Sequence, residues 1–308
     1  MVSYGCRVPS LTVPRVIAVV GPTAAGKSAL SLALAHELGA EVVNADSMQL
    51  YRGMDIGTAK LAPAERAGVP HHVLDIWDVT VTASVAEYQK LARAAIEDIA
   101  ARGRVPLLVG GSGLYIRAVL EEFEFPGTDP AIRARLEAEL AAGGPAPLFA
   151  RLRAADPAAA AKILPSNGRR IVRALEVIDM TGAPFTATLP APVPYFPSVQ
   201  IGVDRATPDL DERIAERVTH MWRAGLLDEV RGLPRLREGR TAARALGYQQ
   251  ALAQLDGTLT AAEAQDATVR ATRRFVRRQR SWFRRDPRIV WLDGASPALV
   301  ADAVAAAR

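Results

Sequence analysis

The stretch GPTAAGKS, residues 21–28, decides the fold of this 308-residue chain. It satisfies every fixed position of the phosphate-loop pattern G-x-x-x-x-G-K-[ST], in which backbone N–H groups and a helix N-terminus surround a diphosphate. Residues 16–20 (VIAVV) before it have the pattern of a buried strand, and residues 28–38 after it that of a helix. Because strand, glycine loop and helix follow in the required order, the stretch predicts a bound diphosphate rather than a chance glycine turn.

Each loop residue has an expected role in that site. Lys27 reaches the outer phosphate, and the Ser28 hydroxyl binds a Mg²⁺ ion that shares the diphosphate charge. The residues predicted to bind the diphosphate are Gly21, Pro22, Thr23, Ala24, Ala25, Gly26, Lys27 and Ser28.

Composition limits the classes of protein that this chain can belong to. Hydrophobic residues make up 49% of it and charged residues 23%, as in a globular protein. No uncharged apolar run approaches the roughly 20 residues of a membrane helix, so we expect no membrane partner. Residues 1–13 lack a continuous apolar block, which predicts a disordered tail rather than a secretory signal. Cys6 is the only cysteine, which excludes a disulfide framework and favours a reducing cytoplasm.

Strand patterns recur along both ends of the chain. Beyond residues 16–20, strands are predicted over residues 41–45, 73–77, 105–109, 199–203 and 289–292. Helices are predicted between them, including residues 84–101 with Ser84 as cap and Glu87 three residues on. This alternation predicts an α/β fold with a phosphate-loop type, doubly wound parallel sheet.

The middle of the chain has a different pattern. From residue 123 to residue 197 strands are absent and alanine-rich helical segments dominate, up to a proline-dense end. We therefore predict a core of residues 14–122 and 198–308, interrupted by an all-helical insertion domain over residues 123–197. Further helices of the core are predicted over residues 210–224, 226–236 and 261–285.

Two polar positions follow predicted strands and are candidates for catalysis. Asp46 ends the second strand, at the sheet edge where ligands bind in open α/β folds, and can accept a proton or hold magnesium through water. Its alternative role is a helix cap or an Asx turn. Ser112 lies in a second glycine turn, GGSGLY, predicted to lie near the phosphate loop. His71 and His72 are adjacent on a strand and point to opposite faces, so we interpret them as structural.

The net charge of +5 is concentrated near the C-terminus. Helical spacing aligns Arg270, Arg273, Arg274, Arg277, Arg284 and Arg288 in one stripe, and Val269, Val276 and Phe283 in another. A solvated basic face explains this pattern as well as an RNA surface does, in which Trp282 and Phe283 would add stacking.

Six motifs together resemble the bacterial tRNA dimethylallyltransferases, also called tRNA isopentenyltransferases. In chain order they are GPTAAGKS, NADSMQLYRGMDIGTAK, GGSGLY, GRRIVRALEV, ARALGYQQ and RRQRSWFR. Ser28 and Ser112 stand where threonine is common in that family, and both keep the hydroxyl. The zinc finger of the eukaryotic relatives is missing, in agreement with the single cysteine.

The resemblance implies an activity and its partners. A dimethylallyl group passes from dimethylallyl diphosphate to N6 of the adenosine immediately 3′ of the anticodon, and diphosphate is released. The expected partners are tRNA and dimethylallyl diphosphate, with Mg²⁺ as cofactor and the protein as a monomer. The adenine is expected to leave its stack and enter a channel between core and insertion.

The resemblance also assigns roles to residues. Asp46 acts as general base, Ser112 bridges phosphate and base, and Lys27, Ser28 with magnesium and Arg213 or Arg217 neutralise the departing diphosphate. The tRNA contacts that it implies are Asp46, Ser47, Met48, Gln49, Ser112, Arg133, Arg169, Arg170, Ile171, Val172, Arg173, Arg244, Ala245, Leu246, Gly247, Tyr248, Gln249, Arg277, Arg278, Gln279, Arg280, Ser281, Trp282, Phe283 and Arg284.

Two rival functions use the same features. A nucleotide or small-molecule kinase has the same phosphate loop, and an RNA-binding module without chemistry has the same basic face.

Overall fold

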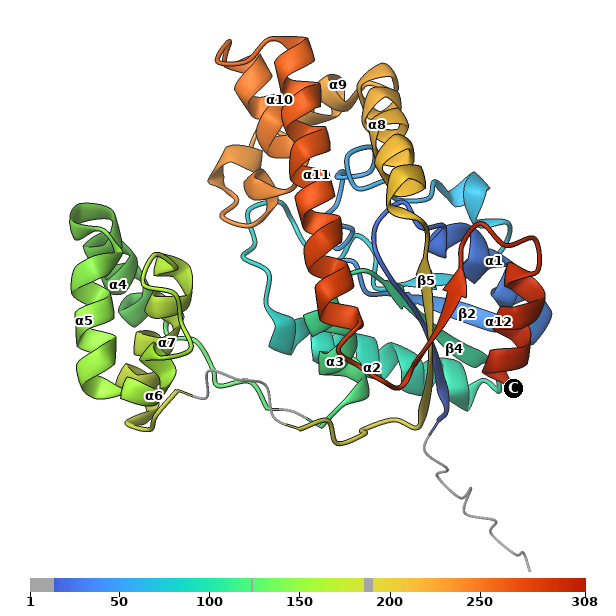
Figure 1. Ribbon diagram of the computed structural model, residues 1–308, viewed down its shortest axis with the longest axis horizontal. Coiled ribbons are helices and arrows are strands. Elements are labelled where there is room, and N and C mark those ends of the chain that lie inside the picture. The colour runs from blue at the N-terminus through green and yellow to red at the C-terminus, as the bar shows by residue number, and fades with distance from the viewer. Residues whose placement is uncertain (1–13, 123, 186–190) are drawn as a thin grey trace, which may run out of the picture. The chain divides into compact units, whose positions relative to one another are not determined.

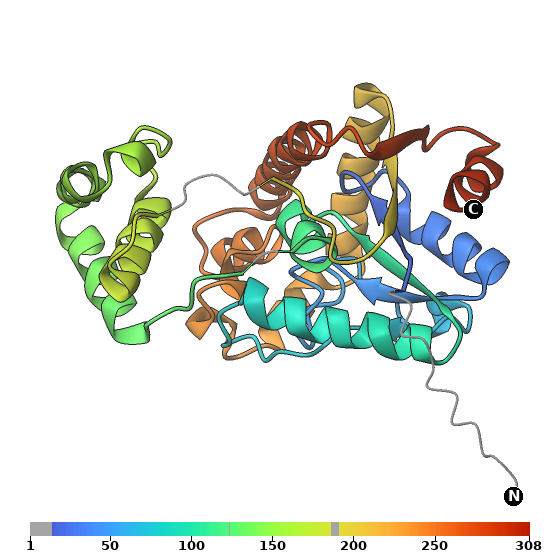
Figure 2. The same cartoon turned by 90° about the horizontal axis from the view of Figure 1, so that it is seen from below.

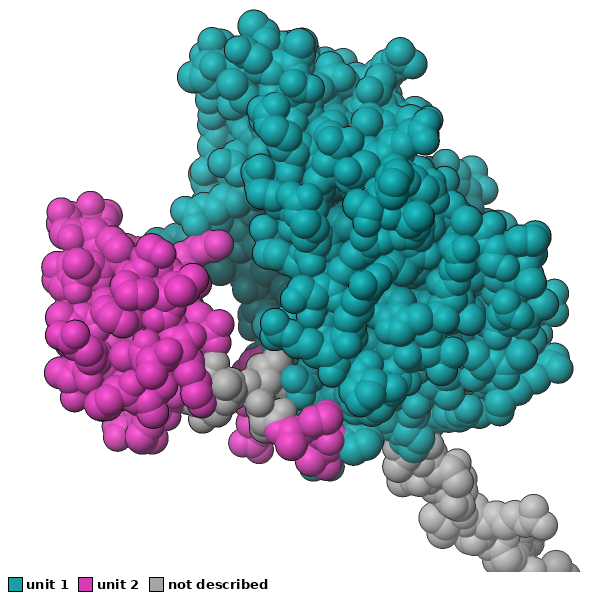
Figure 3. All heavy atoms as spheres, in the orientation of Figure 1, with its two compact units in different colours: residues 1–122, 194–308 teal, residues 123–193 magenta. Residues whose placement is uncertain are grey.

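The computed structural model describes residues 14–122, 124–185 and 191–308. The chain forms two compact units, of which unit 1 comprises residues 1–122 and 194–308 and unit 2 residues 123–193 (Figures 1 and 3). The predicted tail over residues 1–13 lies outside the described residues.

A six-stranded, wholly parallel sheet forms the centre of unit 1. Its strands, in spatial order, are β3 (His71–His72), β2 (Ala40–Asn44), β4 (Val105–Gly110), β1 (Val16–Val20), β5 (Ser198–Asp204) and β6 (Ile289–Asp293). All five residues of β1 and of β2 are buried, because both faces of a doubly wound sheet are covered.

Helices cover both faces of this sheet (Figures 1 and 2). One apolar core contains residues of α1 (Lys27–Leu38) and α12 (Leu299–Ala307), and a second core contains residues of α2 (Val85–Ala101) and α3 (Gly113–Leu120). The predicted Ser84 cap is confirmed, since its hydroxyl oxygen accepts the Glu87 N–H at 3.3 Å. The predicted doubly wound α/β fold is confirmed by this arrangement.

The remaining helices of unit 1 lie beside the carboxyl edge of the sheet. They are α8 (Thr207–Arg223), α9 (Leu226–Arg231), α10 (Tyr248–Leu255) and α11 (Ala261–Phe283), and short 3₁₀ turns lie at Pro63–Arg66, Leu236–Glu238 and Ala242–Arg244. The long helix α11 packs against α8 and α10. It buries Val276 and Phe283, as the predicted apolar stripe requires.

Unit 2 consists of α4 (Pro130–Gly143), α5 (Pro145–Ala155), α6 (Pro157–Ala160) and α7 (Gly168–Thr181). Leu136, Leu152 and Leu175 are among the residues of its own apolar core. The Glu176 side chain is fully buried in this unit and accepts hydrogen bonds from Thr128, Arg133 and Arg173. These contacts satisfy a carboxylate that would otherwise be costly to bury.

Three predicted boundaries differ from the structure. The strand predicted over residues 73–77 is wrong, because Val73 and Asp75 adopt positive φ values of 59° and 56°, which an extended strand excludes; the strand is His71–His72. The helix predicted over residues 226–236 ends at Arg231. Residues 194–197 belong to unit 1, where Phe196 is buried and the Tyr195 N–H donates to the Leu120 carbonyl.

Two negative findings apply to the described residues only. Within 14–122, 124–185 and 191–308, no helix combines the length and apolar character that a membrane span needs. In the same ranges no cluster of three or more His, Cys, Asp or Glu side chains could hold a metal. His71 and His72 contact the Val69 carbonyl and the Glu41 carboxylate, at 2.8 Å and 2.7 Å, which agrees with a structural role.

Candidate active site

Three strand ends converge at the carboxyl edge of the sheet. The register pairs Val20 with Gly110 and Asn44 with Val109, so the residues after β1, β2 and β4 emerge side by side. Gly21 adopts φ of 138°, and a Cβ there would lie 2.2 Å from the Val203 carbonyl oxygen. Only glycine can make this turn, which begins the phosphate loop.

Lys27 is the first residue of α1 and lies at the centre of the site. Its ammonium donates to the Pro22 carbonyl at 2.7 Å, which holds the side chain folded back over the loop. Burial lowers the pKa of Lys27 from 10.5 to about 8, and the nearby Arg217 guanidinium lowers it further, whereas Asp46 opposes the shift. An anionic ligand would favour the charged form of this lysine.

Asp46 is held rigidly by its neighbours. Its N–H donates to the Asn44 side-chain oxygen at 2.9 Å, and the Asn44 amide donates back to the Asp46 carbonyl at 3.1 Å. Its own Oδ1 accepts the Met48 N–H at 2.9 Å, so the Asx turn considered from the sequence does form. The same residue lines both cavities of the site, so the turn fixes a carboxylate that is open to ligands.

Ser112 follows the glycine turn after β4, at the N-cap position of α3, and its side chain contacts Ser47. The Ser47 N–H donates to the Ser112 hydroxyl at 3.3 Å, and the two hydroxyl groups are 3.4 Å apart. Ser112 therefore lies next to the Asp46 turn, and it lines a cavity together with Lys27.

Two cavities open at this edge. The first, of about 450 Å³, is lined by the phosphate loop and by one face of α8. The second, of about 310 Å³, is lined more by apolar side chains, including Met48, Val218, Met221 and Phe275. The residues that line both cavities are Thr23, Lys27, Asp46, Thr58, Gly111 and Arg217. The two chambers thus meet at the charged residues Lys27, Asp46 and Arg217.

Helix α8 supplies two arginines to the first cavity. Arg213 Nε donates to the Ala24 carbonyl of the phosphate loop at 2.9 Å, and Arg217 Nη2 donates to the Thr58 carbonyl at 3.3 Å. Burial lowers the pKa of Arg217. In each guanidinium group one nitrogen donates to a backbone carbonyl, and the other N–H donors remain for an anion.

One residue of α11 joins the two glycine turns. The buried Gln279 side chain accepts the Thr23 N–H at 3.0 Å and donates to the Gly111 carbonyl at 2.9 Å. This bridge fixes the basic helix against the phosphate loop.

Comparison with known proteins decides the family. The family model described as IPP transferase matches residues 49–286. A protein of Salinispora arenicola named tRNA dimethylallyltransferase is 75% identical over 295 residues, which cover 95% of this chain and 86% of the relative. A protein of the same name from Streptomyces avermitilis is 70% identical over 285 residues, with 92% of this chain and 91% of the relative covered. The chain belongs to the tRNA dimethylallyltransferase family.

Solved structures agree with this family. The tRNA isopentenylpyrophosphate transferase of Bacillus halodurans matches with a TM-score of 0.66 at 42% identity, over 92% of this chain and 90% of that one. A eukaryotic dimethylallyltransferase acting on tRNA matches with a TM-score of 0.75 at 27% identity, over 91% and 74% of the two chains. The fold of this chain is thus shared with solved members of the family.

Many of the residues that a dimethylallyltransferase is expected to use for tRNA contacts fall into two groups. Some expose their side chains or line the second cavity: Ser47, Met48, Arg244, Leu246, Arg277, Arg278, Ser281 and Trp282. Others are buried, and their side chains hold the fold: Ile171, Val172, Tyr248 and Phe283. Ala245 and Gln279 are buried as well, but they also line the second cavity. Direct contact of the second group with RNA is limited by this burial, although their neighbours remain exposed.

Several of the expected arginines of this family member are engaged inside the chain. Arg133 and Arg173 bind Glu176, and Arg280 pairs with Asp204 at 2.8 Å with 14% of its side chain exposed. Arg288 lies beyond the end of α11, so its predicted place on the helical stripe is wrong; it binds Glu121 and Asp286 instead. Arg277 and Arg278 remain exposed on the helix.

Sequence reasoning missed several residues of this dimethylallyltransferase site. Asn44 holds Asp46, and Thr58 holds Arg217 through its carbonyl. Glu216 and His220 line the first cavity from α8. The position of Asn44 at a strand end is a signal that could have identified it, whereas a backbone carbonyl contact leaves no trace in the residue types.

Proposed function

We propose that this protein transfers the dimethylallyl group of dimethylallyl diphosphate to N6 of the adenosine 3′ to the tRNA anticodon. The N6–carbon bond forms, the bond between that carbon and the diphosphate oxygen breaks, and the N6 proton passes to Asp46. The observation that carries this proposal is the meeting of the two cavities at Lys27, Asp46 and Arg217.

The first cavity suits the diphosphate of the donor. Its lining includes the phosphate loop, Lys27 and the two α8 arginines Arg213 and Arg217. Fixed cations around a leaving group stabilise the charge that develops as the carbon–oxygen bond breaks. The departing diphosphate therefore stays in the polar chamber while the dimethylallyl carbon faces the junction.

The residues present also fit a magnesium ion. Ser28 offers a hydroxyl oxygen at the start of α1, and Asp46 and Glu216 add carboxylates to the same cavity. Mg²⁺ keeps several waters and binds through substrate phosphates, so a site without three clustered carboxylates is sufficient. The ion would neutralise part of the diphosphate charge when bound.

The second cavity suits the adenine. Asp46 and Ser112 line it beside the apolar side chains of Met48 and Phe275, which offer a surface for a base taken out of its stack. Asp46, held by Asn44, orients N6 and accepts its proton. Arg244 and Arg278, which line this cavity, and the exposed Arg277 of α11 supply phosphate contacts. We also propose that the protein acts as a monomer on cytoplasmic tRNA.

Separate reactions with two labelled substrates test the proposal. The protein is incubated with unmodified tRNA and Mg²⁺, and in separate reactions with dimethylallyl diphosphate labelled in the prenyl group or with ATP labelled in the γ-phosphate. The expected result is prenyl label in tRNA and no transfer of phosphate. Phosphate transfer would instead support a kinase, and binding of tRNA without either label would support a binding module.

A further inference from the structure

Residues 55–60, which follow the Asp46 turn, form a tight loop over the donor cavity. The buried Thr58 lines both cavities, and its carbonyl accepts hydrogen bonds from Gln49 Nε2 at 3.2 Å and from Arg217 Nη2 at 3.3 Å. Among the described residues, this carbonyl is the hydrogen-bond partner recorded for the Arg217 guanidinium. The position of the loop therefore sets the direction of Arg217.

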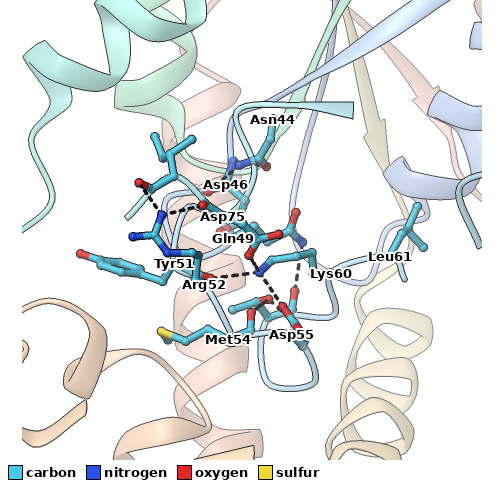
Figure 4. A network of polar contacts seen from close by, with 12 residues as sticks. Asn44, Asp46, Gln49, Tyr51, Arg52, Met54, Asp55, Lys60, Leu61 and Asp75 are labelled. Carbon is cyan, nitrogen blue, oxygen red and sulfur yellow. Dashed lines mark hydrogen bonds and ion pairs between the residues drawn. The ribbon is translucent and has the colours of Figure 1, made fainter. Parts of the chain in front are cut away.

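The inner side of the loop is held by Lys60. Its ammonium contacts Asp55 and Asp75 at 2.6 Å and 2.5 Å and the Tyr51 carbonyl at 3.0 Å, with 3% of the side chain exposed (Figure 4). These contacts fix the two ends of the loop against each other. None of these contacts of Lys60 uses the N–H groups of residues 55–57.

The outer side of the loop is held by one carboxylate of α9, which none of the steps above uses. Glu229 accepts the N–H groups of Asp55 at 3.1 Å, Ile56 at 2.6 Å and Gly57 at 3.4 Å. It also accepts the Tyr248 hydroxyl at 2.5 Å. Four donors on one carboxylate, three of them backbone, form a strong charge-assisted clamp.

Tyr248 completes this clamp from the other direction. Its ring lies against Gly57, where an added Cβ would be 2.4 Å from Cε2 of the ring. Tyr248 is fully buried and follows Arg244, Ala245 and Leu246, which line the second cavity. The clamp thus joins a segment of the acceptor cavity to the loop that holds Arg217.

We propose that Glu229 is a positioning residue for the donor site. Through the N–H groups of Asp55, Ile56 and Gly57 it fixes the Thr58 carbonyl, and this carbonyl aims Arg217 at the leaving diphosphate. The inference rests on the proposed function, because it assigns the diphosphate to the cavity that Arg217 lines.

The direct test is Glu229→Gln, which keeps the shape of the side chain but removes its charge. Binding of inorganic diphosphate with Mg²⁺ is measured by calorimetry, and KM for the prenyl donor and for tRNA by initial rates. We expect the diphosphate Kd and the donor KM to rise about tenfold, with tRNA KM within about twofold of wild type. Unchanged diphosphate binding and donor KM would overturn the proposal.

A double-mutant cycle separates positioning from general damage to the fold. If Glu229 acts through Arg217, then Glu229→Gln adds less than about twofold to the diphosphate Kd of Arg217→Met. If the increases in diphosphate Kd caused by the two single substitutions multiply in the double variant, Glu229 acts by another route and the proposal is overturned.

Two further variants serve as second test and control. Tyr248→Phe removes one of the four donors while keeping the ring on Gly57, and we expect it to raise the diphosphate Kd by about threefold. If neither Tyr248→Phe nor Glu229→Gln raises the diphosphate Kd, the clamp is contradicted.

Asp228→Asn is the matched control, since this neighbour on α9 has 78% of its side chain exposed and, within the described part of the chain, its carboxylate pairs only with Arg231. If wild-type protein itself forms no prenylated tRNA, the proposed function fails; if wild type and Glu229→Gln form it with equal donor KM, only this inference fails.

Discussion

At the scale of single residues, Asp46 is the proposed general base, and its replacement should give the clearest effect. Asp46→Ala should lower the rate of transfer by roughly 100-fold to 10,000-fold, because a positioned general base contributes about that much. The affinity for tRNA should change little, since we propose that exposed arginines make the phosphate contacts. Single-turnover rates alongside filter binding measure both quantities.

The control for that substitution is Asp302→Ala, an exposed carboxylate on α12. It should leave both rate and affinity unchanged. A rate for Asp46→Ala within about threefold of wild type would exclude Asp46 as the base.

The lowered pKa of Lys27 predicts that donor binding depends on pH. Burial lowers its pKa to about 8 in the free protein, so the ammonium is charged below that pH and neutral above it. Because the charged form attracts diphosphate, affinity should fall as pH rises through about 8, and proton uptake should accompany binding near that pH. Calorimetry in buffers of different ionisation enthalpy reads both effects.

Diphosphate itself also titrates, so Lys27→Met is the reference for that experiment. The variant should bind more weakly at pH 7, and the loss relative to wild type should shrink above pH 8. A loss that stays constant from pH 7 to pH 9 would contradict the lowered pKa.

The sequence predicted Lys27, Asp46 and Ser112 because each follows a strand in a short glycine or polar motif. It did not predict Asn44, Thr58 or Glu229, which act through backbone groups. Such contacts depend on where the loop of residues 55–60 folds back, and any residue offers the same carbonyl. The burial of Tyr248 was missed for a related reason, because an aromatic side chain suits either an RNA surface or a core, whereas the burial of Phe283 agrees with the predicted apolar stripe.

At the scale of elements, the strand β2 is tied to its neighbours by Glu41. Arg102 of the α2 C-terminus donates to this carboxylate, and His72 of β3 contacts it at 2.7 Å. The hydrogen bond from Arg102, with a smaller contribution from His72, lowers the pKa of Glu41 from 4.5 to about 2. The ionised carboxylate is therefore favoured by folding.

Glu41→Gln should lower the free energy of unfolding by about 2 kcal/mol at pH 7, the usual worth of hydrogen bonds to a charged group. The folded-state pKa is lowered, so this stabilisation is fully present above pH 4.5 and is lost as pH falls toward about 2. Urea unfolding across that range, with the exposed Glu37→Gln as control, measures it. A difference that persists unchanged at pH 2 would contradict the assignment.

The strands with long apolar runs were predicted within one or two residues, since β1, β2, β4 and β5 are buried by helices on both faces. The third strand was misplaced by two residues at its start and five at its end, because Val73 leaves the strand at positive φ and its carbonyl turns toward Asn44. A valine rarely adopts that conformation, so its sequence pattern favoured a strand.

At the scale of the whole molecule, the basic surface of α11 should dominate tRNA affinity. Replacing Arg277, Arg278 and Arg284 together by glutamine should weaken tRNA binding and flatten its salt dependence. Each lost phosphate contact lowers the slope of log affinity against log salt by roughly 0.7 to 0.9. A salt series of filter-binding titrations gives this slope.

The control removes the same charge elsewhere, from Arg231, Arg235 and Arg237, which are exposed and paired with carboxylates. The control should keep a slope closer to that of wild type. If the α11 variant retains wild-type slope and affinity, its arginines are only a solvated face, and recognition moves to Arg169 and Arg170 of unit 2.

The division into two units was foreseen from composition, because strands stop where alanine-rich helices begin. The end of the insertion was predicted at residue 197, whereas unit 2 ends at residue 193. Phe196 is buried in unit 1, although prolines surround it in the sequence. Burial of one aromatic side chain decides this boundary, and burial depends on the packed sheet rather than on local pattern.

One measurement tests the central claim most directly, namely that an adenine amine attacks the donor at the junction of the two cavities. Unmodified tRNA is incubated with dimethylallyl diphosphate, Mg²⁺ and either wild-type protein or Asp46→Ala, then digested to nucleosides and analysed by mass spectrometry. With wild type we expect one adenosine per tRNA, immediately 3′ of the anticodon, to carry a dimethylallyl group on N6, and with Asp46→Ala almost none in the same time. Modification at another atom or nucleoside, or none with wild-type protein, would contradict the account.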